Sequence, residues 1–443
     1  MSNKLSDIVN FNPSRILKKG TVAPFIEMAS LPTNTKFIKQ IDEKPFSGGS
    51  KFKNGDTLFA RITPCLENGK TGKVTNLKDE IIGHGSTEFI VMSAKEPEFD
   101  EDYIYYFARL PEFREFAQQR MVGTSGRQRV AWQDLADFEF IFPPKEQRKK
   151  AAAFLNIYDQ KIDLNTQINQ TLEQIAQALF KSWFVDFDPV RAKVQALSDG
   201  LSLEQAELAA MQAISGKTPE ELTALSQTQP DHYAELAETA KAFPCEMVEV
   251  DGVEVPKGWK IGTFTDITES RREKVKNDKA TVLSAVSSGE LVKSEEYFTK
   301  QVFSKSIDKY LKVYQWDFAY NPARINIGSI GLHEADYLGA VSPVYEVFSV
   351  SDKYHWFLKR ILNLETTKIK IQSLCTGSVR QTLKLKDFQS IDCVIPDEKT
   401  LSIFNKKWEE YRTLILENNE NTQTLSEIRD LLLSRLLSGD FND

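Results

Sequence analysis

The sequence predicts an α+β protein made of two similar halves, each a mixed domain of helices and strands followed by one long helix. A chain of 443 residues is too long for a single hydrophobic core, which indicates several domains. A helical apolar stripe also occurs twice, and Tyr158 of the first copy recurs as Tyr411, 253 positions later. The two copies consist of Tyr158, Ile162, Asn165, Leu172, Ile175 and Leu179, and of Tyr411, Ile415, Asn418, Leu425, Ile428 and Leu432.

The repeat extends from the helix into the domain that precedes it. Without a gap, the same offset matches Ser125, Arg127, Gln128, Asp134 and Pro143 to Ser378, Arg380, Gln381, Asp387 and Pro396. The repeated unit is therefore a domain together with its helix. We predict a first domain at residues 1–144, its helix at 145–187, an acidic helical insert or linker at 188–255, a second domain at 256–396, and a second helix with the C-terminal tail at 397–443.

Local patterns predict the elements within each domain. In the first domain, a polar turn at Asn54 and Gly55 leads into an apolar strand that ends at Ile62. Aromatic residues at helical intervals follow between Tyr103 and Gln119, and then a loop rich in Gly and Ser. A last strand alternates Phe with other residues up to Pro143. The second domain has counterparts at 316–325, 352–364, 375–381 and 388–395.

The two long helices predict an antiparallel coiled coil with a pseudo-twofold axis. Some 38 helical residues span about 57 Å, more than packing on one domain requires. A narrow stripe of that length needs a partner helix, and the obvious partner is the other copy. Asn165 and Asn418 stand at equivalent positions, where they are expected to fix the register. The first helix ends in an aromatic cluster at Trp183, which we assign with the stripe to helix pairing and partner docking.

The charge is unevenly distributed along the chain. Residues 186–255 hold 14 acidic and 4 basic residues, whereas the remainder holds 49 acidic and 52 basic residues. The two halves are thus mildly basic, which permits nucleic-acid binding. The insert is interpreted as a small packing element with a linker, and a solvated spacer is the alternative.

The sequence shows no catalytic, metal-binding or cofactor-binding motif. Its four Cys and four His show no ligand spacing, which predicts reduced thiols in a cytoplasmic protein and no metal site. No run approaches the roughly 18 apolar residues of a membrane span. Residues 69–71 read GKT, but Pro64 stands where a phosphate-binding loop needs Gly. We therefore expect no catalysis and no cofactor on this chain.

Two groups of residues are candidates for contact with DNA. Backbone amides beside Gly, with Ser hydroxyls and Arg, suit phosphate oxygens, although a solvated turn explains the same pattern. An Arg after each Ala-Arg-Ile strand fits the edge of a guanine, or pairs equally well with a carboxylate. The candidates are Arg61, Lys70, Ser125, Arg127, Gln128, Arg129, Arg324, Asn326, Ser378, Arg380 and Gln381.

The combined pattern resembles the specificity subunit of type I restriction-modification enzymes over nearly the whole chain. The resemblance rests on Ala178–Lys193, Val255–Trp259, Gly83–Met92 and Ala340–Phe348, and on the loops TSGRQRV and TGSVRQTL. It implies two target recognition domains, at 1–144 and 256–396, that each read one half of an asymmetric split site in double-stranded DNA. It also implies spacer helices that dock two modification (methyltransferase) subunits. The two loops place Gly differently, so they need not contact DNA identically.

The resemblance places chemistry on other subunits. S-adenosylmethionine would belong to the modification subunit, and ATP and Mg²⁺ to a restriction subunit if one is present. Two alternatives differ in measurable ways. A coiled-coil adaptor joining two protein-binding domains would show no salt-sensitive DNA affinity. An unrecognised nuclease would show metal-dependent cleavage by the isolated chain.

Overall fold

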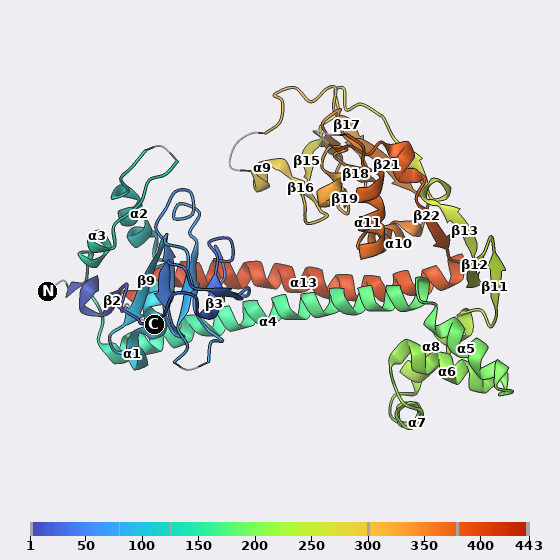
Figure 1. Ribbon diagram of the computed structural model, residues 1–443, viewed down its shortest axis with the longest axis horizontal. Helices are drawn as coiled ribbons and strands as arrows, with labels where there is room; N and C mark the ends of the chain where they lie inside the picture. Colours follow the sequence, from blue (N-terminus) through green and yellow to red (C-terminus); the bar gives the residue numbers. More distant parts are fainter. Residues whose placement is uncertain (1–2, 79, 125, 299–301, 378–380, 440–443) are drawn as a thin grey trace. The chain divides into compact units, whose positions relative to one another are not determined.

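The computed structural model describes residues 3–78, 80–124, 126–298, 302–377 and 381–439. The chain divides into two compact units, one comprising Met1–Thr171 and Thr413–Asp443 and the other Leu172–Arg412. Each unit holds one mixed domain and a stretch of both long helices (Figure 1). Among the described helices, none is long and apolar enough to cross a membrane.

Two four-stranded sheets form the domain of the first unit. Their strand orders are β2-β9-β6-β7 and β4-β3-β8-β5, and every pairing is antiparallel except that of β3 with β8. A two-stranded pair, β1 with β10, joins the ends of the domain. The strands are β1 Asn3–Lys4, β2 Val9–Phe11, β3 Val22–Ile26, β4 Asp42–Pro45, β5 Ser50–Phe52, β6 Thr57–Ala60, β7 Thr71–Lys73, β8 Gly83–Gly85, β9 Phe89–Ala94 and β10 Glu139–Phe140.

Three short helices complete this domain around an aromatic core. They are α1 Pro97–Phe107, α2 Pro111–Gln119 and α3 Trp132–Ala136, and the 3-10 turn η1 Leu5–Asp7 precedes β2. Proline suits the first turn of α1 and α2, because its φ is already helical and no N–H is lost there. Phe107 packs at ring-centroid distances of 5.8, 5.0 and 5.5 Å on Phe138, Phe140 and Phe142. The predicted alternation of Phe residues thus points one face of the segment toward α1.

The second unit repeats this topology strand for strand. Its sheets have the orders β14-β21-β18-β19 and β16-β15-β20-β17, with β13 paired to β22 and a parallel pairing only between β15 and β20 in these sheets. The strands are β13 Lys260–Thr263, β14 Thr268–Ser270, β15 Thr281–Ala285, β16 Leu291–Lys293, β17 Leu311–Val313, β18 Phe318–Tyr320, β19 Ile330–Leu332, β20 Gly339–Val341, β21 Glu346–Val350 and β22 Asp392–Ile395. The helical segments are η2 Phe264–Asp266, α9 Ser294–Tyr297, η3 Ile325–Ile327, α10 Tyr354–Leu362, α11 Glu365–Leu374 and α12 Leu385–Gln389.

A glycine occurs in the same turn of both domains, after β6 in the first domain and after β18 in the second. Gly69 follows β6 with φ 75°, and Gly328 follows β18 with φ 88°. Both values lie in the left-handed region, which favours glycine because a Cβ is disfavoured there. In each domain this glycine stands two residues before the next strand, and its left-handed backbone gives the recurrence a physical cause.

The insert of the second unit is a packed helical element with a hairpin. Its elements are α5 Asp188–Ser198, α6 Leu203–Ser215, α7 Pro219–Thr228, α8 Pro230–Ala242, β11 Met247–Val250 and β12 Val253–Pro256. Capping boxes at Ser202 and Thr218 begin α6 and α7. Phe243 packs edge-on against Trp183 at 5.1 Å, so the aromatic end of the first long helix is covered by the insert.

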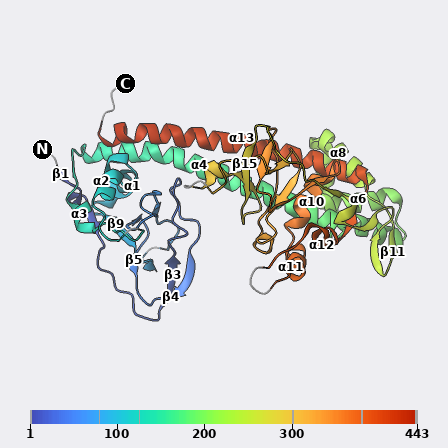
Figure 2. The same ribbon diagram turned by 90° about the horizontal axis from the view of Figure 1, so that it is seen from above.

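The long helices α4 Lys145–Phe184 and α13 Glu398–Leu437 lie side by side within each unit (Figures 1 and 2). Within the first unit they are antiparallel, since Asn169 contacts Asn419 at 2.9 Å whereas Asp159 contacts Arg429. The predicted Asn pair lies in this interface, where Asn165 Nδ2 donates to the Asn418 carbonyl at 3.5 Å. The helix α4 ends three residues before the expected position 187, because Phe187 is left-handed with φ 59°.

The predicted stripe is only partly buried. Ile162 is buried, and most of the other stripe positions are half-buried: Tyr158, Leu172, Leu179, Tyr411, Ile415, Leu425 and Leu432. Ile175 and Ile428, which stand at equivalent positions, are 40% and 37% exposed, so the helix pair covers them less than it covers the rest of the stripe. A straight helix drifts by about 20° per heptad against a 3.5-residue pattern, which turns some positions of a long stripe toward solvent.

Candidate nucleic-acid interface

The Gly and Ser loop of the first domain lies directly beside the Ala-Arg-Ile segment. An isolated antiparallel bridge joins Ile62 to Arg129. Thr63 N donates to the Gln128 carbonyl at 3.0 Å, and Val130 N donates to the Arg61 carbonyl at 3.0 Å. Two candidate groups that are about 60 residues apart in the sequence thus form one surface. Ser125 lies outside the described residues.

The structure assigns two of the candidate cations to internal partners. Arg129 Nη2 donates to Glu88 at 2.7 Å, and its Nε donates to both carboxylate oxygens. These hydrogen bonds raise the pKa of Arg129. Lys70 Nζ donates to the carbonyls of Met28 and Ala29 at 2.8 and 3.3 Å. Both cations therefore hold the domain together, which the sequence did not reveal because their partners are distant in the chain.

Arg127 and Arg61 remain the candidate cations of this surface. Arg127 is exposed on the loop. Arg61 is half-buried, and its Nε has no hydrogen-bond partner among the described residues. The side chain of Gln128 is half-exposed beside them.

The second domain brings the corresponding segments together. Asn326 Nδ2 donates to Gln381 Oε1 at 3.3 Å, and Leu383 N donates to the Pro322 carbonyl at 3.2 Å. Arg324 is exposed next to them. Ser378 and Arg380 lie outside the described residues. Asn326 also lines an open cavity of about 580 Å³, whose charged residues are of both signs and so favour no anion.

The second domain also carries a basic surface that none of the sequence motifs indicated. Val275 N donates to the Tyr310 carbonyl at 2.9 Å and Lys276 N donates to the Asp308 carbonyl at 3.0 Å, which joins segments 271–279 and 305–312. The exposed lysines on these segments are Lys274, Lys276, Lys279, Lys305 and Lys309. The signal was present as the run RREKVKNDK from Arg271 to Lys279.

Neither a metal-binding cluster nor a disulfide is found in the part of the chain that the structure describes. No group of three His, Cys, Asp or Glu side chains there is placed to hold a metal ion. The four cysteines, all half-buried, are free thiols.

Comparisons with known proteins agree with this picture. The family model described as type I restriction modification DNA specificity domain matches residues 2–174. The chain is 38% identical to the type I restriction enzyme HindI specificity subunit of Haemophilus influenzae, over 92% of both chains. It is 23% identical to the MjaIX specificity subunit of Methanocaldococcus jannaschii, over 76% of this chain and 68% of that one.

Among solved structures, the S subunit of a type I restriction-modification system from M. genitalium is similar over 99% of this chain and 96% of that chain. The identity is 13% and the TM-score 0.47. The family rests on the sequence relatives, above all on the match at 38% identity along nearly the full length of both chains. The chain belongs to the specificity subunits of type I restriction-modification enzymes.

Proposed function

We propose that this subunit reads a bipartite DNA site, one half with each mixed domain, and that its helices set the unread spacer. The observation that carries the proposal is the duplication: the same strand order is used twice, with different exposed side chains on each copy. Two readers joined by long helices imply two half-sites separated by bases that are not read.

The candidate contacts divide into two kinds. We assign phosphate contacts to the exposed cations Arg127, Lys274 and Lys276 as part of this proposal. Neutralising phosphates positions a protein on DNA without reading its sequence. Arg61 and Arg324 remain the candidates for base edges, since a guanidinium matches the two acceptors of guanine.

Two modification subunits are proposed to dock along the long helices. Four apolar side chains of α4 in the first unit are exposed at spacings of 3, 7 and 4 residues: Phe154, Ile157, Leu164 and Ile168. Such spacing places them on one face of the helix, offset from the face that meets α13. Methyl transfer from S-adenosylmethionine is assigned to those subunits, and ATP with Mg²⁺ to a restriction subunit where one is present.

Single-molecule sequencing of DNA from cells that express this chain with a modification subunit tests the proposal. Methylation at a split motif with an unread gap, absent when this chain is omitted, is the expected result. A complex that assembles and methylates other sites in a purified system, but never a split motif, would overturn it.

A further inference from the structure

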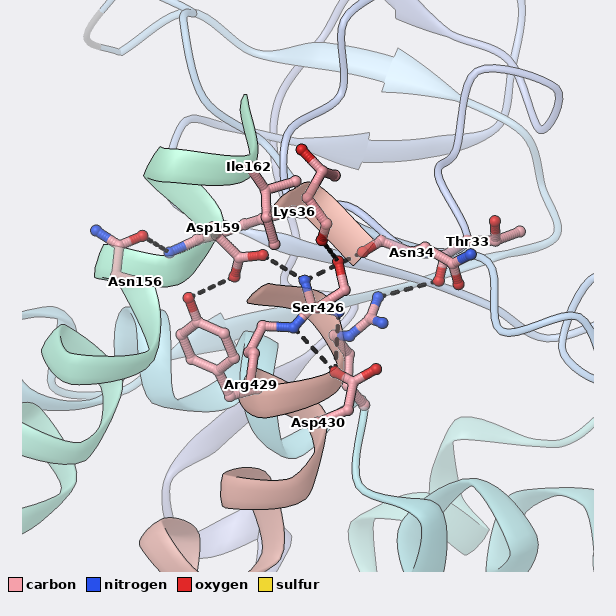
Figure 3. A network of polar contacts seen from close by, with 12 residues as sticks. Thr33, Asn34, Lys36, Asn156, Asp159, Ile162, Ser426, Arg429 and Asp430 are labelled. Atoms are coloured by element: carbon pink, nitrogen blue, oxygen red, sulfur yellow. Dashed lines mark hydrogen bonds and ion pairs between the residues drawn. The ribbon is translucent and has the colours of Figure 1, made fainter. Parts of the chain in front are cut away.

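One segment of the first domain contacts both long helices. Residues 32–39 connect β3 to β4, and the Asn34 carbonyl of this segment accepts from Arg429 Nη1 of α13 at 3.1 Å. Lys39 pairs with Asp163 of α4 at 3.3 Å. Figure 3 shows Asn34 and Lys36 beside Asp159 of α4 and Arg429 of α13. The segment is therefore a bridge between the recognition domain and the helix pair of its own unit.

The centre of this bridge is a buried ion pair. Arg429 Nη1 and Asp159 Oδ1 are 2.5 Å apart, and both side chains are 1% exposed. Tyr106 of α1 donates its hydroxyl to the second carboxylate oxygen at 2.6 Å. Burial alone lowers the pKa of Arg429, but Asp159 and Asp430 outweigh burial and raise it. Arg429 therefore stays charged, and a charged hydrogen bond constrains the direction of its partner as well as the distance.

Lys36 adds a second buried link. Its ammonium donates to Asn156 of α4 at 2.7 Å and to Asp102, which lies on α1, at 2.8 Å. The Lys36 side chain is 1% exposed. Burial raises the pKa of Asp102, but Lys36 and Lys73 outweigh burial and lower it. The segment is thus tied through Lys36 to the domain's own helix and to α4.

The internal repeat shows that the fold does not demand this chemistry. At the repeat offset, the counterpart of Asp159 is Arg412 and that of Arg429 is Ala176. In the second unit, Arg412 pairs instead with Glu334 at 3.0 Å. The same topology is therefore held to its helices by a different polar set in each unit.

We propose that Asp159, Arg429 and Lys36 are positioning residues that fix where the first recognition domain sits along the helices, and with it the spacer length tolerated between the half-sites. The inference rests on the proposed function. Apolar contacts are non-directional and allow a domain to shift, whereas a buried polar network has one satisfied arrangement. The core contacts of Leu433 and Leu437 keep the domain on the helices. A domain released from the network is therefore expected to tilt on these contacts and to accept half-sites at neighbouring spacings.

The test uses the full chain assembled with modification subunits. The variants are the neutral pair Asp159→Asn with Arg429→Gln, and separately Lys36→Gln. The matched control is Lys149→Ala, because Lys149 joins α4 to Glu98 of α1 by an exposed pair at 3.0 Å. Methylation rates are measured on DNA with the native spacer and with one base pair added or removed. The melting temperature of each variant reports whether it is folded.

We expect the rate ratio of altered to native spacer to rise about tenfold in both variants and to stay unchanged in the control. A purely structural role would lower the rates on all spacers equally or lower the melting temperature alone, and either result in both variants would overturn the inference. If the wild-type complex methylates no split site, the proposed function fails. If it does and the ratios do not move, this inference alone fails.

Discussion

Arg127 and Arg129 stand two residues apart in one loop, yet their surroundings differ. Arg129 is held by the carboxylate of Glu88, whereas Arg127 is exposed to solvent. A cation that already has a carboxylate partner must break that pair to bind phosphate, so its net gain on binding DNA is small. At the scale of single residues, whether an arginine is free to bind phosphate depends on its internal ion pairs and not on its position in the loop.

Replacing Arg127 with Ala is expected to weaken DNA binding evenly across sequences. If Arg127 neutralises one phosphate, the slope of log affinity against log salt falls by about 1. Binding of the assembled complex is measured at several salt concentrations. Arg129→Ala is the matched control and should leave that slope unchanged. Loss of preference at one base position in the Arg127 variant would contradict the phosphate role.

His355 is expected to make the second unit sensitive to acid. Burial lowers its pKa to about 4, and its ring stacks on Trp316 at 4.5 Å. The unfolded chain takes up a proton near pH 6.5 whereas the folded chain does not. The stability from this group is therefore complete above pH 6.5 and is lost as the pH falls toward 4.

Between pH 6.5 and 4, the free energy of unfolding is expected to fall by about 2 kcal/mol. This is less than the full pKa shift implies, because the His355 ring is partly exposed to solvent. His355→Gln should flatten the pH dependence of unfolding by that amount. Tryptophan fluorescence in urea measures it, since five of the six tryptophans lie in the second unit. An unchanged slope between pH 6.5 and 4 in the variant would rule out His355 as the cause.

At the scale of elements, the last turns of α13 belong to the core of the first domain. Leu433 and Leu437 are buried in the same cluster as Phe107, and Tyr103 donates its hydroxyl to the Leu437 carbonyl at 2.7 Å. A domain that begins the sequence is thus completed by the helix that ends it. This arrangement explains why the first unit includes residues 413–443.

Leu437→Ala is expected to lower the free energy of unfolding of the first unit by about 2–5 kcal/mol, because it removes buried methyl groups and leaves a cavity. Leu431, on the same helix, is 78% exposed. Leu431→Ala should therefore change the stability by no more than about 0.5 kcal/mol. Urea unfolding followed by circular dichroism compares them. Equal effects of the two substitutions would show that the end of α13 is not part of this core.

At the scale of the whole molecule, the two domains share a topology but differ in their exposed side chains and in the contacts that hold them to the helices. Because each domain has its own sheets and core clusters, its recognition surface can change without altering the other domain. The helix contacts set a condition on such changes, since Lys36 and the segment around it must continue to fit α4 and α13.

Exchanging residues 1–144 for the matching domain of a related subunit is expected to change one half-site only. A graft that retains Lys36 and Tyr106 should keep the native spacer, because both contact the helices. Methylation mapping of the exchanged protein identifies both half-sites and the gap. A simultaneous change in both half-sites would refute independent reading.

The sequence by itself determined the duplication, the two long helices, the place of the loops and the family. These features depend on short-range periodicity and on residue identity at a fixed offset, which are readable along one chain. Asn165 and Asn418 were expected to fix the register of the helix pair, and the Asn165 side chain contacts the Asn418 backbone carbonyl between the helices.

Only the tertiary structure decided which side chains remain free. Glu88 reaches Arg129 across 41 positions and Met28 accepts from Lys70 across 42, and no local pattern encodes either contact. The exposure of Ile175 and Ile428, and the buried pair of Asp159 with Arg429 across 270 positions, likewise depend on how two helices and a domain pack. These residues are distant in the sequence and come into contact only when the chain folds. Burial and charge pairing depend on distance in space, so no pattern along the sequence encodes them.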